Sequence, residues 1–279
     1  MQTVQITMTL TEKKIGFVGT GKMGSAIIHG LTASSLIKPS NIYASDIDET
    51  ALNGIANKYG ITPCADNNEV VDQSDVIILA VKPQILDTVL SGIKNHVQAR
   101  HLVISIAAGI PIRFIAKYLP ADTKIIRIMP NITATVRAAP SALSAGTGVT
   151  QEEIQTAKYI FDSVGSTVIV SEDLMDAVTG LSGSGPAFVS IFIEAMTDAG
   201  VYCGLNRNTS LTLAAQTVLG SAKMILETGV HPASLKDMVT SPAGTTIEGI
   251  HELEMHKVRA GVMGAVIAAV KRSKELGGK

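Results

Sequence analysis

The chain has 279 residues, a length that predicts two domains at about 150 residues per domain. Only 17% of the residues are charged, 4% are aromatic, the formal net charge is −1 and the mean hydropathy is +0.31. This composition excludes disorder over most of the chain, and it does not fit modules that bind nucleic acids through aromatic stacking. No block of like charge offers a footprint for a phosphate backbone, so we expect no nucleic-acid partner.

The positive hydropathy does not predict a membrane protein. The longest suspicious stretch, residues 260–270, has eleven uncharged residues, and a spanning helix needs ~20. Residues 1–10 lack the basic start and the cleavage site of a signal peptide, so we expect a cytoplasmic protein without a membrane partner. Cys64 and Cys203 lack the spacing of a metal site or a disulfide framework and are interpreted as small core residues. No metal is predicted.

From Lys13 to about Val170, short apolar runs alternate with helical patterns, which is typical of βαβ units and a doubly wound, mostly parallel sheet. The run at 76–81 is continuously apolar, so we expect helices on both faces of the sheet. Strands are predicted at 15–19, 41–46, 75–81, 101–109, 124–130 and 166–170. Helices are predicted near 22–35, 48–58, 84–98, 111–118 and 151–163.

After Ser171 the strand patterns vanish and helices separated by Gly and Pro follow. We therefore predict an α/β, Rossmann-type dinucleotide-binding domain over residues 1–171, with 1–12 as an N-terminal extension. An all-helical dimerisation and substrate domain is predicted over 172–279. Its helices are expected from Pro186 to before Gly204, from Asn208 to Thr228, briefly from Pro232, and from Thr245 to about Leu276.

The last predicted helix has an apolar stripe with small residues that allow close backbone approach. Val258, Val262, Val266 and Val270 recur at helical spacing, and the glycines within the helix each cost ~1 kcal/mol against Ala. Tight packing against another helix offsets that cost. We therefore predict an obligate homodimer built from the helical domain.

The segment after the first strand reads G-x-G-x-x-G and leads into a helical pattern. Gly19 permits the tight turn, Gly21 lets the backbone approach a pyrophosphate, and Gly24 lets helix and strand pack closely. Free amides at the start of the helix would bind the phosphates. The alternative is a structural turn only. The predicted cofactor-binding residues here are Gly19, Thr20, Gly21, Lys22, Met23 and Gly24.

Asp46 lies 22 positions after Gly24, where the carboxylate that recognises the ribose is expected. It can accept both ribose hydroxyls and would repel a 2′-phosphate, and no Arg lies nearby, so the sequence favours NADH over NADPH. Two alternatives stay open: Ser45 or a backbone shift admits the phosphate, or Asp46 only caps the helix at 48–58.

Later strand ends should border the same crevice, because ligands bind outside the carboxyl ends of parallel strands. Small residues at 107–109 would let a flat nicotinamide lie close, and Asn131 could hydrogen-bond its carboxamide. Tight turns alone would also explain these residues. The positions predicted to bind cofactor are Ala80, Val81, Lys82, Pro83, Ala107, Ala108, Gly109 and Asn131.

Two segments of the helical domain, 179–186 and 240–246, are dense in Gly, Ser, Thr and Pro, and each precedes a helix. Thr245 and Glu248 have capping-box spacing, so backbone amides should converge at the start of the last helix. Such a site fits a small carboxylate. The alternative is a well-capped helix without a ligand.

With these motifs the chain resembles the pyrroline-5-carboxylate reductase family from Lys13 to about Glu275. Two departures are Ala243, where the family often has Gly, and Asp46, since many members accept NADPH. The motifs are Gly19 to Gly24, Ala80-Val81-Lys82-Pro83, Met129-Pro130-Asn131, the run from Asp176 to Ala187, and Leu235-Lys236 leading to Val239 through Thr246.

The resemblance implies reduction of the C=N bond of 1-pyrroline-5-carboxylate by NAD(P)H to give L-proline, the last step of proline biosynthesis. It also implies a helical domain that interlocks with its dimer mate, often within a decamer, and a substrate pocket completed by the partner's Ser-Pro-x-Gly-x-Thr loop. Asn67 matches a family position near the adenosine ribose.

Within this resemblance we assign the substrate residues to the second polar segment. Thr246 is expected to hydrogen-bond the substrate nitrogen as the catalytic residue, and Ser241, Gly244 and Thr245 to bind the carboxylate. Reduction of a protonated imine needs donor and acceptor held together more than it needs a buried acid. His231 and His251 are interpreted as structural or exposed residues.

Two rival functions stay open. A β-hydroxyacid dehydrogenase has a similar fold plan, but it places a catalytic Lys where this chain has Val189, and no Lys occurs between Lys158 and Lys223. A non-catalytic, dinucleotide-sensing dimer would not need the intact loop at 240–246.

Overall fold

The computed structural model describes residues 12–278, so the predicted N-terminal extension lies outside the described residues except for its last position. Contacts divide the chain into two compact units. The first comprises the described chain up to Gly183 together with the C-terminal residues from Ala269, and the second is Ser184–Ala268. Each unit is described by itself.

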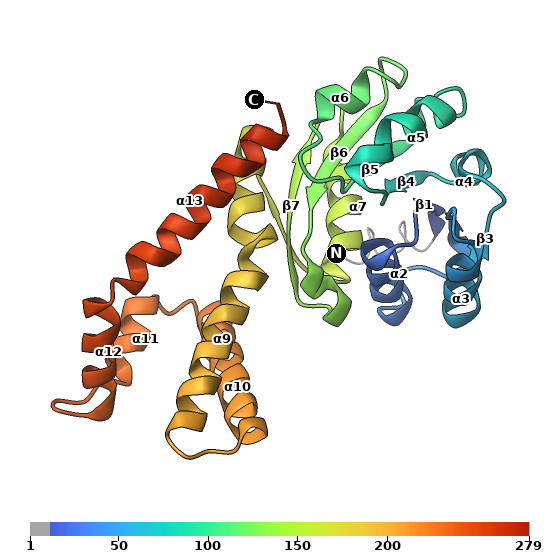
Figure 1. Cartoon of the computed structure of the whole chain (residues 1–279). Coiled ribbons are helices and arrows are strands. Elements are labelled where there is room, and N and C mark those ends of the chain that lie inside the picture. Colours follow the sequence, from blue (N-terminus) through green and yellow to red (C-terminus); the bar gives the residue numbers. More distant parts are fainter. Residues whose placement is uncertain (1–11, 279) are drawn as a thin grey trace. The chain divides into compact units, whose positions relative to one another are not determined.

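The first unit is built on an eight-stranded sheet with the order β3-β2-β1-β4-β5-β6-β7-β8 (Figure 1). Every neighbouring pair is parallel except β6 and β7, so the predicted mostly parallel sheet is confirmed. The strands are β1 Ile15–Val18, β2 Ile42–Ser45, β3 Thr62–Pro63, β4 Val76–Leu79, β5 Leu102–Ser105, β6 Lys124–Met129, β7 Ala139–Ala145 and β8 Gly165–Ile169.

Helices cover both faces of this sheet, as the unbroken apolar strands predict. In β4, Val76 and Ile78 face one core while Ile77 and Leu79 face the other, because successive side chains alternate across a strand. The first core is closed by α2 Lys22–Ala33, α3 Glu49–Tyr59 and α7 Gln151–Asp162. The second core is closed by α4 Asn67–Gln73, α5 Leu86–Ile93 and α6 Ile112–Ala116.

Some elements of the first unit differ from the prediction. Strand β7 was not predicted, because its sequence APSALSA has few large apolar residues; it pairs in antiparallel fashion with β6 and parallel to β8. The short elements β3 and α4 were also missed. Helix α5 is shorter than the predicted 84–98, because a 3₁₀ turn at Pro83–Ile85 precedes it and it ends at Ile93.

The second unit contains helices only. Helices α9 Gly185–Tyr202 and α10 Arg207–Thr228 form a hairpin, followed by α11 Pro232–Met238 and α12 Thr245–Met255; α13 Val258–Leu276 begins in this unit and ends in the first. The hairpin packs closely at Gly200, where an added Cβ would lie 2.0 Å from the Ser210 hydroxyl. That hydroxyl donates to the Thr197 carbonyl at 2.6 Å.

The prediction of one continuous helix from Thr245 to Leu276 is wrong. Helix α12 ends at Met255, and Lys257 has a φ of 55°, in the left-handed region. A residue in that conformation stops a right-handed helix. No Gly or Pro marks the break, and the apolar spacing continues on both sides of it, so periodicity alone could not reveal it.

Many large apolar side chains of the second unit are exposed in the single chain. On α13, Val262, Met263 and Ile267 are 55 to 64% exposed, and Phe192 of α9 and Leu219 of α10 are also exposed. Apolar faces of this extent mark interaction sites. Among the helices of residues 12–278, none is long and apolar enough to cross a membrane.

His101, just before β5, is a buried titratable group of the first unit. Its side chain is fully buried, its Nδ1 accepts a hydrogen bond from the Gln98 amide at 3.0 Å, and its Nε2 has no hydrogen-bond partner among the described residues. Burial, assisted by the neighbouring Arg100 charge, lowers the pKa of His101 to about 4. His101 is therefore neutral in the folded protein.

This shift predicts a specific loss of stability in mild acid. Between pH 6.5 and 4 the unfolded chain binds a proton at His101 that the folded chain does not, so the free energy of unfolding falls as the pH falls. From pH 7 to 5 we expect a loss of about 2 kcal/mol from this residue. Urea unfolding at fixed protein concentration measures it. The slope of the unfolding free energy against pH should flatten in His101→Gln and persist in His251→Gln, a control at an exposed residue. Equal slopes in the wild type and both variants would contradict the assignment.

Candidate active site

The glycine-rich loop joins β1 to α2 and has the geometry of a phosphate cradle. Gly19 has a φ of 98°, and an added Cβ there would lie 2.8 Å from the Ala80 carbonyl oxygen; a Cβ on Gly24 would lie 2.4 Å from the Gly19 oxygen. Around Gly21, in contrast, an added Cβ would meet nothing within 4 Å. Two glycines therefore pack against backbone, and the third faces open space where a ligand could approach.

The first turn of α2 is free to bind an anion. Gly21 is its N-cap and provides no side-chain cap, and no acidic residue lies in the first turn. The amide groups at this end carry the positive end of the helix dipole. The donor set fits the pyrophosphate of a dinucleotide, which this chain would hold through backbone N–H groups.

Asp46, at the end of β2, is tied to this loop. Its Oδ2 accepts hydrogen bonds from the Thr20 amide at 2.6 Å and the Thr20 hydroxyl at 2.9 Å, and its Oδ1 accepts from the Asp48 amide at 3.1 Å. Burial raises the pKa of Asp46, but these bonds outweigh burial and hold the pKa below its ordinary value. Asp46 is thus ionised near neutral pH and largely engaged by the protein. The cap of α3 is Asp48, not Asp46.

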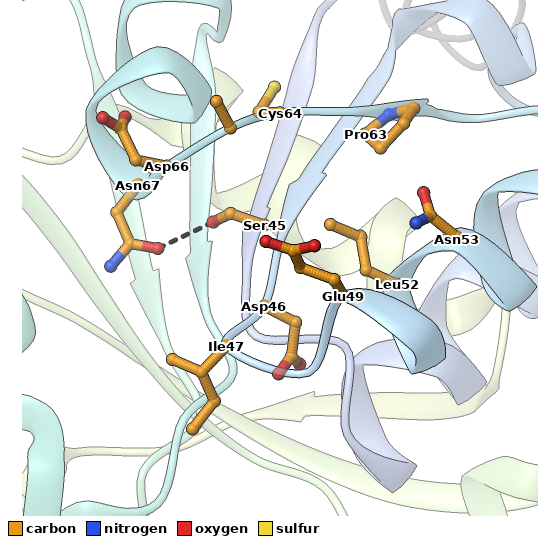
Figure 2. A pocket seen from close by; sticks show the side chains of 11 residues that line it. Ser45, Asp46, Ile47, Glu49, Leu52, Asn53, Pro63, Cys64, Asp66 and Asn67 are labelled. Atoms are coloured by element: carbon orange, nitrogen blue, oxygen red, sulfur yellow. Dashed lines mark hydrogen bonds between the residues drawn. The ribbon is translucent and has the colours of Figure 1, made fainter.

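Beside Asp46 lies a cavity of 540 Å³ with an acidic lining (Figure 2). Asp46, Glu49 and Asp66 line it, and none of its lining residues is Lys or Arg. Asn67 also lines it, and its Oδ1 accepts a hydrogen bond from the Ser45 hydroxyl at 2.7 Å (Figure 2). The cavity can hold a neutral, hydroxyl-rich group such as a ribose better than a phosphate.

A second cavity, of 350 Å³, adjoins the first and brings together residues from three strand ends. It is lined by Gly19 and Gly21 of the loop, by Asp46 and Asn67, and by Ala80, Val81 and Lys82 after β4. Its apolar wall was not predicted from the sequence and consists of Ile47, which is 97% exposed, together with Ile85 and Val89. In the sequence, the one sign of this wall is an isoleucine that stands between two aspartates in a loop.

Other predicted cofactor residues do not line these cavities. Thr20, Lys22, Met23 and Gly24 belong to the loop and the first turn of α2, and Pro83 begins a 3₁₀ turn. Ala107 is buried, Ala108 is exposed, and Gly109 turns the chain after β5 with a φ of 75°.

Asn131 is engaged within the protein. It is 7% exposed, its Nδ2 donates to the Ser182 carbonyl at 2.9 Å, and its Oδ1 accepts from the Thr133 amide and hydroxyl at 3.0 and 2.6 Å. These contacts are those of a residue that holds the polar segment 179–186, which we call the Gly-Ser segment. They are not those of a side chain that is free to bind the carboxamide of the nicotinamide.

In the second unit, the polar segment before α12 ends in an uncapped helix N-terminus. Gly244 is the N-cap, no side chain caps the helix, and Thr245 and Thr246 lie in the first turn. The predicted capping box of Thr245 and Glu248 is therefore wrong, because Thr245 already stands inside the helix. The chain reaches Gly244 through Ala243, whose φ is 53°, and the Gly244 amide donates to the Ser241 carbonyl at 3.1 Å. The first-turn amides are left for an anion.

Cys64 and Cys203 are free thiols in different surroundings. Burial, with the charges of Glu69 and Asp66, raises the pKa of the Cys64 thiol to about 11, so Cys64 stays protonated at neutral pH. Cys203 is exposed, and its interpretation as a core residue is wrong. Within residues 12–278, no three His, Cys, Asp or Glu side chains gather as metal ligands would.

Comparison with known proteins agrees with this geometry. The family described as "Pyrroline-5-carboxylate reductase dimerisation" matches residues 172–276, and the family described as "NADP oxidoreductase coenzyme F420-dependent" matches residues 14–109. The pyrroline-5-carboxylate reductase of Methanosarcina acetivorans is 54% identical over 97% of this chain and 100% of its own length. The chain belongs to the pyrroline-5-carboxylate reductase family.

Solved structures of pyrroline-5-carboxylate reductases share the whole fold. The enzyme from Coxiella burnetii superposes with a TM-score of 0.91 at 36% identity, covering 95% of this chain and 98% of that one. The enzyme from Plasmodium falciparum, solved with NADP bound, has a TM-score of 0.84 at 34% identity, covering 96% and 99%. This chain is an NAD(P)H-dependent pyrroline-5-carboxylate reductase of proline biosynthesis with a helical dimerisation domain.

Proposed function

We propose that this reductase uses NADH, and that one uncapped helix N-terminus binds the cofactor while a second binds the substrate. The observation that carries the proposal is the pair of open first turns: α2 begins at Gly21 and α12 begins after Gly244, both without a side-chain cap. Each presents unpaired amides to an anion. The start of α2 fits the pyrophosphate of the dinucleotide, and the start of α12 fits the substrate carboxylate.

The residues of the α12 loop would bind and orient the cyclic imine. The amides and hydroxyls of Ser241, Gly244 and Thr245 hold its carboxylate, and the Thr246 hydroxyl hydrogen-bonds the ring nitrogen. When bound, the dinucleotide supplies the hydride to the imine carbon. The task left to the protein is to hold donor and acceptor at reacting distance, which can lower the barrier by several kcal/mol, up to about 7–11 in the best cases.

For the dinucleotide, we assign binding to the residues that the cavities bring together and to the adjacent turns. Thr20 and Lys22 to Gly24 shape the phosphate cradle, Asn67 lies beside the ribose, and Ala80 to Pro83 form the floor. Ala107, Ala108 and Gly109 would lie beside the nicotinamide. Asn131 would act by holding the Gly-Ser segment rather than by a direct bond to the carboxamide.

The preference for NADH is supported by charge. A 2′-phosphate beside Asp46, Glu49 and Asp66 would be repelled, and no cation among the lining residues of that cavity would offset the repulsion. Because Asp46 is largely engaged by Thr20 and Asp48, it acts mainly through its charge. The NADP bound to the Plasmodium falciparum enzyme shows that a relative accepts the phosphate.

The assignment of Thr246 predicts a loss confined to the chemical step and substrate binding. In Thr246→Ala, kcat/KM for 1-pyrroline-5-carboxylate should fall about 10- to 100-fold, the cost of one hydrogen bond to a charged or developing-charge group. Binding of NADH, followed by its fluorescence, should stay within twofold. The exposed control Thr228→Ala should keep wild-type kinetics, and near-normal turnover in Thr246→Ala would refute the role.

The acidic cavity predicts a cofactor switch by one substitution. The wild-type enzyme should favour NADH over NADPH by about tenfold or more in kcat/KM, which corresponds to ~1.4 kcal/mol. Glu49 is exposed and makes none of the bonds that hold the loop, so Glu49→Lys should shift the ratio several-fold toward NADPH without harming NADH binding. The charge-matched control Glu227→Lys, on α10, should leave the ratio unchanged. A wild-type enzyme that prefers NADPH would overturn this proposal.

We further propose that the homodimer is obligate, with decamers as the assembled form, and that the functional domain boundary falls at 171/172. The exposed apolar face of α13 and the family match beginning at residue 172 support this. Light scattering at micromolar protein should give a dimer or a multiple of it. Val262→Asp should weaken assembly, whereas Val136→Asp, at a position of the first unit that is 73% exposed against 55% for Val262, should not. A monomeric wild-type protein would contradict the proposal.

A further inference from the structure

The last turns of α13 form part of the first unit and are fixed there by a buried hydrogen bond. From Ala269 onward the chain belongs to the first unit. Ser273, 7% exposed, donates its hydroxyl to Oδ1 of Asp176, 3% exposed, at 2.9 Å. The two residues are 97 positions apart in sequence, so this bond ties the end of the chain to the short helix α8 Met175–Val178.

Helix α8 leads directly into the Gly-Ser segment, which forms a π-helical turn at Thr179–Gly183. That turn is held from the sheet side as well. Asn131 donates to the Ser182 carbonyl at 2.9 Å, and a Cβ on Gly183 would lie 2.9 Å from the Met129 methyl group. Such π-helical turns are rare and often mark functional positions. The Ser273 bond therefore secures the helix that leads into this turn, and the end of the turn is held by Met129 of β6 and by Asn131, two residues after it.

The same end of α13 reaches the loop that follows β5. An added Cβ on Gly277 would lie 3.5 Å from the Gly109 carbonyl oxygen, so the backbones of the C-terminal turn and of this loop are neighbours. Gly109 turns with a φ of 75° and belongs to the small-residue loop 107–109, which we assign to the nicotinamide end of the cofactor.

We propose that Ser273 is a positioning residue for dinucleotide binding. Its hydrogen bond to Asp176 keeps the C-terminal turn of α13 behind the loop 107–109, and that turn holds the loop in the conformation that receives the nicotinamide. Loss of the hydroxyl releases the turn, and the loop then has to be ordered when the dinucleotide binds. This inference rests on the proposed placement of the nicotinamide at this loop.

The first test compares Ser273→Ala with Ser273→Thr, which keeps a hydroxyl, and with Ser190→Ala as a control. Ser190 is an exposed serine that bonds only to its own helix, through the Pro186 carbonyl. In Ser273→Ala we expect at least fivefold weaker NADH binding by fluorescence titration without substrate, and a matching rise in the KM for NADH. The KM for the imine and kcat should change less than twofold. Ser273→Thr should bind NADH within twofold of the wild type.

A role in stability alone would give a different pattern. It would lower the melting temperature and the active fraction, and hence the apparent kcat, while the folded molecules bound NADH normally. That outcome in Ser273→Ala would overturn the proposal.

A second variant keeps the test decisive if Ser273→Ala does not fold. Gly277→Leu leaves the buried bond intact and presses a larger side chain on the Gly109 backbone, so it should also weaken NADH binding at least fivefold. NADH binding within twofold of wild type in Gly277→Leu would overturn the proposal. Because binding is measured without substrate, a wild-type enzyme that bound NADH but failed to reduce 1-pyrroline-5-carboxylate would refute the proposed function and leave this test valid.

Discussion

The ionised carboxylate of Asp46 is the constraint on which the cofactor half of the site depends. Two hydrogen bonds from Thr20 fasten Asp46, after β2, to the turn after β1, and a third, from the Asp48 amide, lies within the loop after β2. The glycine loop and the acidic cavity therefore share one edge of the sheet. In the proposed mode of binding, the negative charge that holds the loop is also the charge that a 2′-phosphate would meet. Under that proposal, loop geometry and cofactor preference are coupled, and a change at Asp46 would alter both.

The two units share one type of helix N-terminus. Each has a helix whose N-cap is a glycine with no side chain to bond the first-turn amides, Gly21 in the first unit and Gly244 in the second. Capping side chains are common elsewhere in the chain: Asp48, Asp66, Thr150 and Asn206 all cap their helices. Helices α5, α6 and α9 also begin without a side-chain cap, so what α2 and α12 share is the glycine at the N-cap.

The sequence predicted the parallel core, both glycine-rich segments and the helical second half, because strong apolar runs and glycine spacing report them directly. It missed β7, whose small residues give no strand signal, and the break at Lys257, where a left-handed residue stands without Gly or Pro. At Thr245 the capping-box spacing was present, but the helix starts one residue earlier than that motif requires. Local patterns report composition and period, whereas caps and breaks depend on backbone angles that tertiary contacts decide.

The candidate site likewise contains some residues that the sequence predicts and others that it does not. Gly19, Gly21, Asp46 and Ala80 to Lys82 line one cavity because their strand ends meet at one edge, which topology alone predicts. Ile47, Ile85 and Val89 come from three separate turns and helices, and only the folded chain brings them together. For Asn131, its position at a strand end was informative, but its hydrogen bonds turn out to lie within the protein.

The return of α13 to the first unit also affects how the protein is made. The sheet unit lies almost entirely before Ser184 in sequence, yet it includes Ser273 and Gly277, which follow the whole of the second unit. During synthesis from the N-terminus, the sheet can form early while Ser273 and Gly277 are still absent. Under the proposed role of Ser273, the dinucleotide site therefore reaches its final form only after the helices of residues 184–268 have been made.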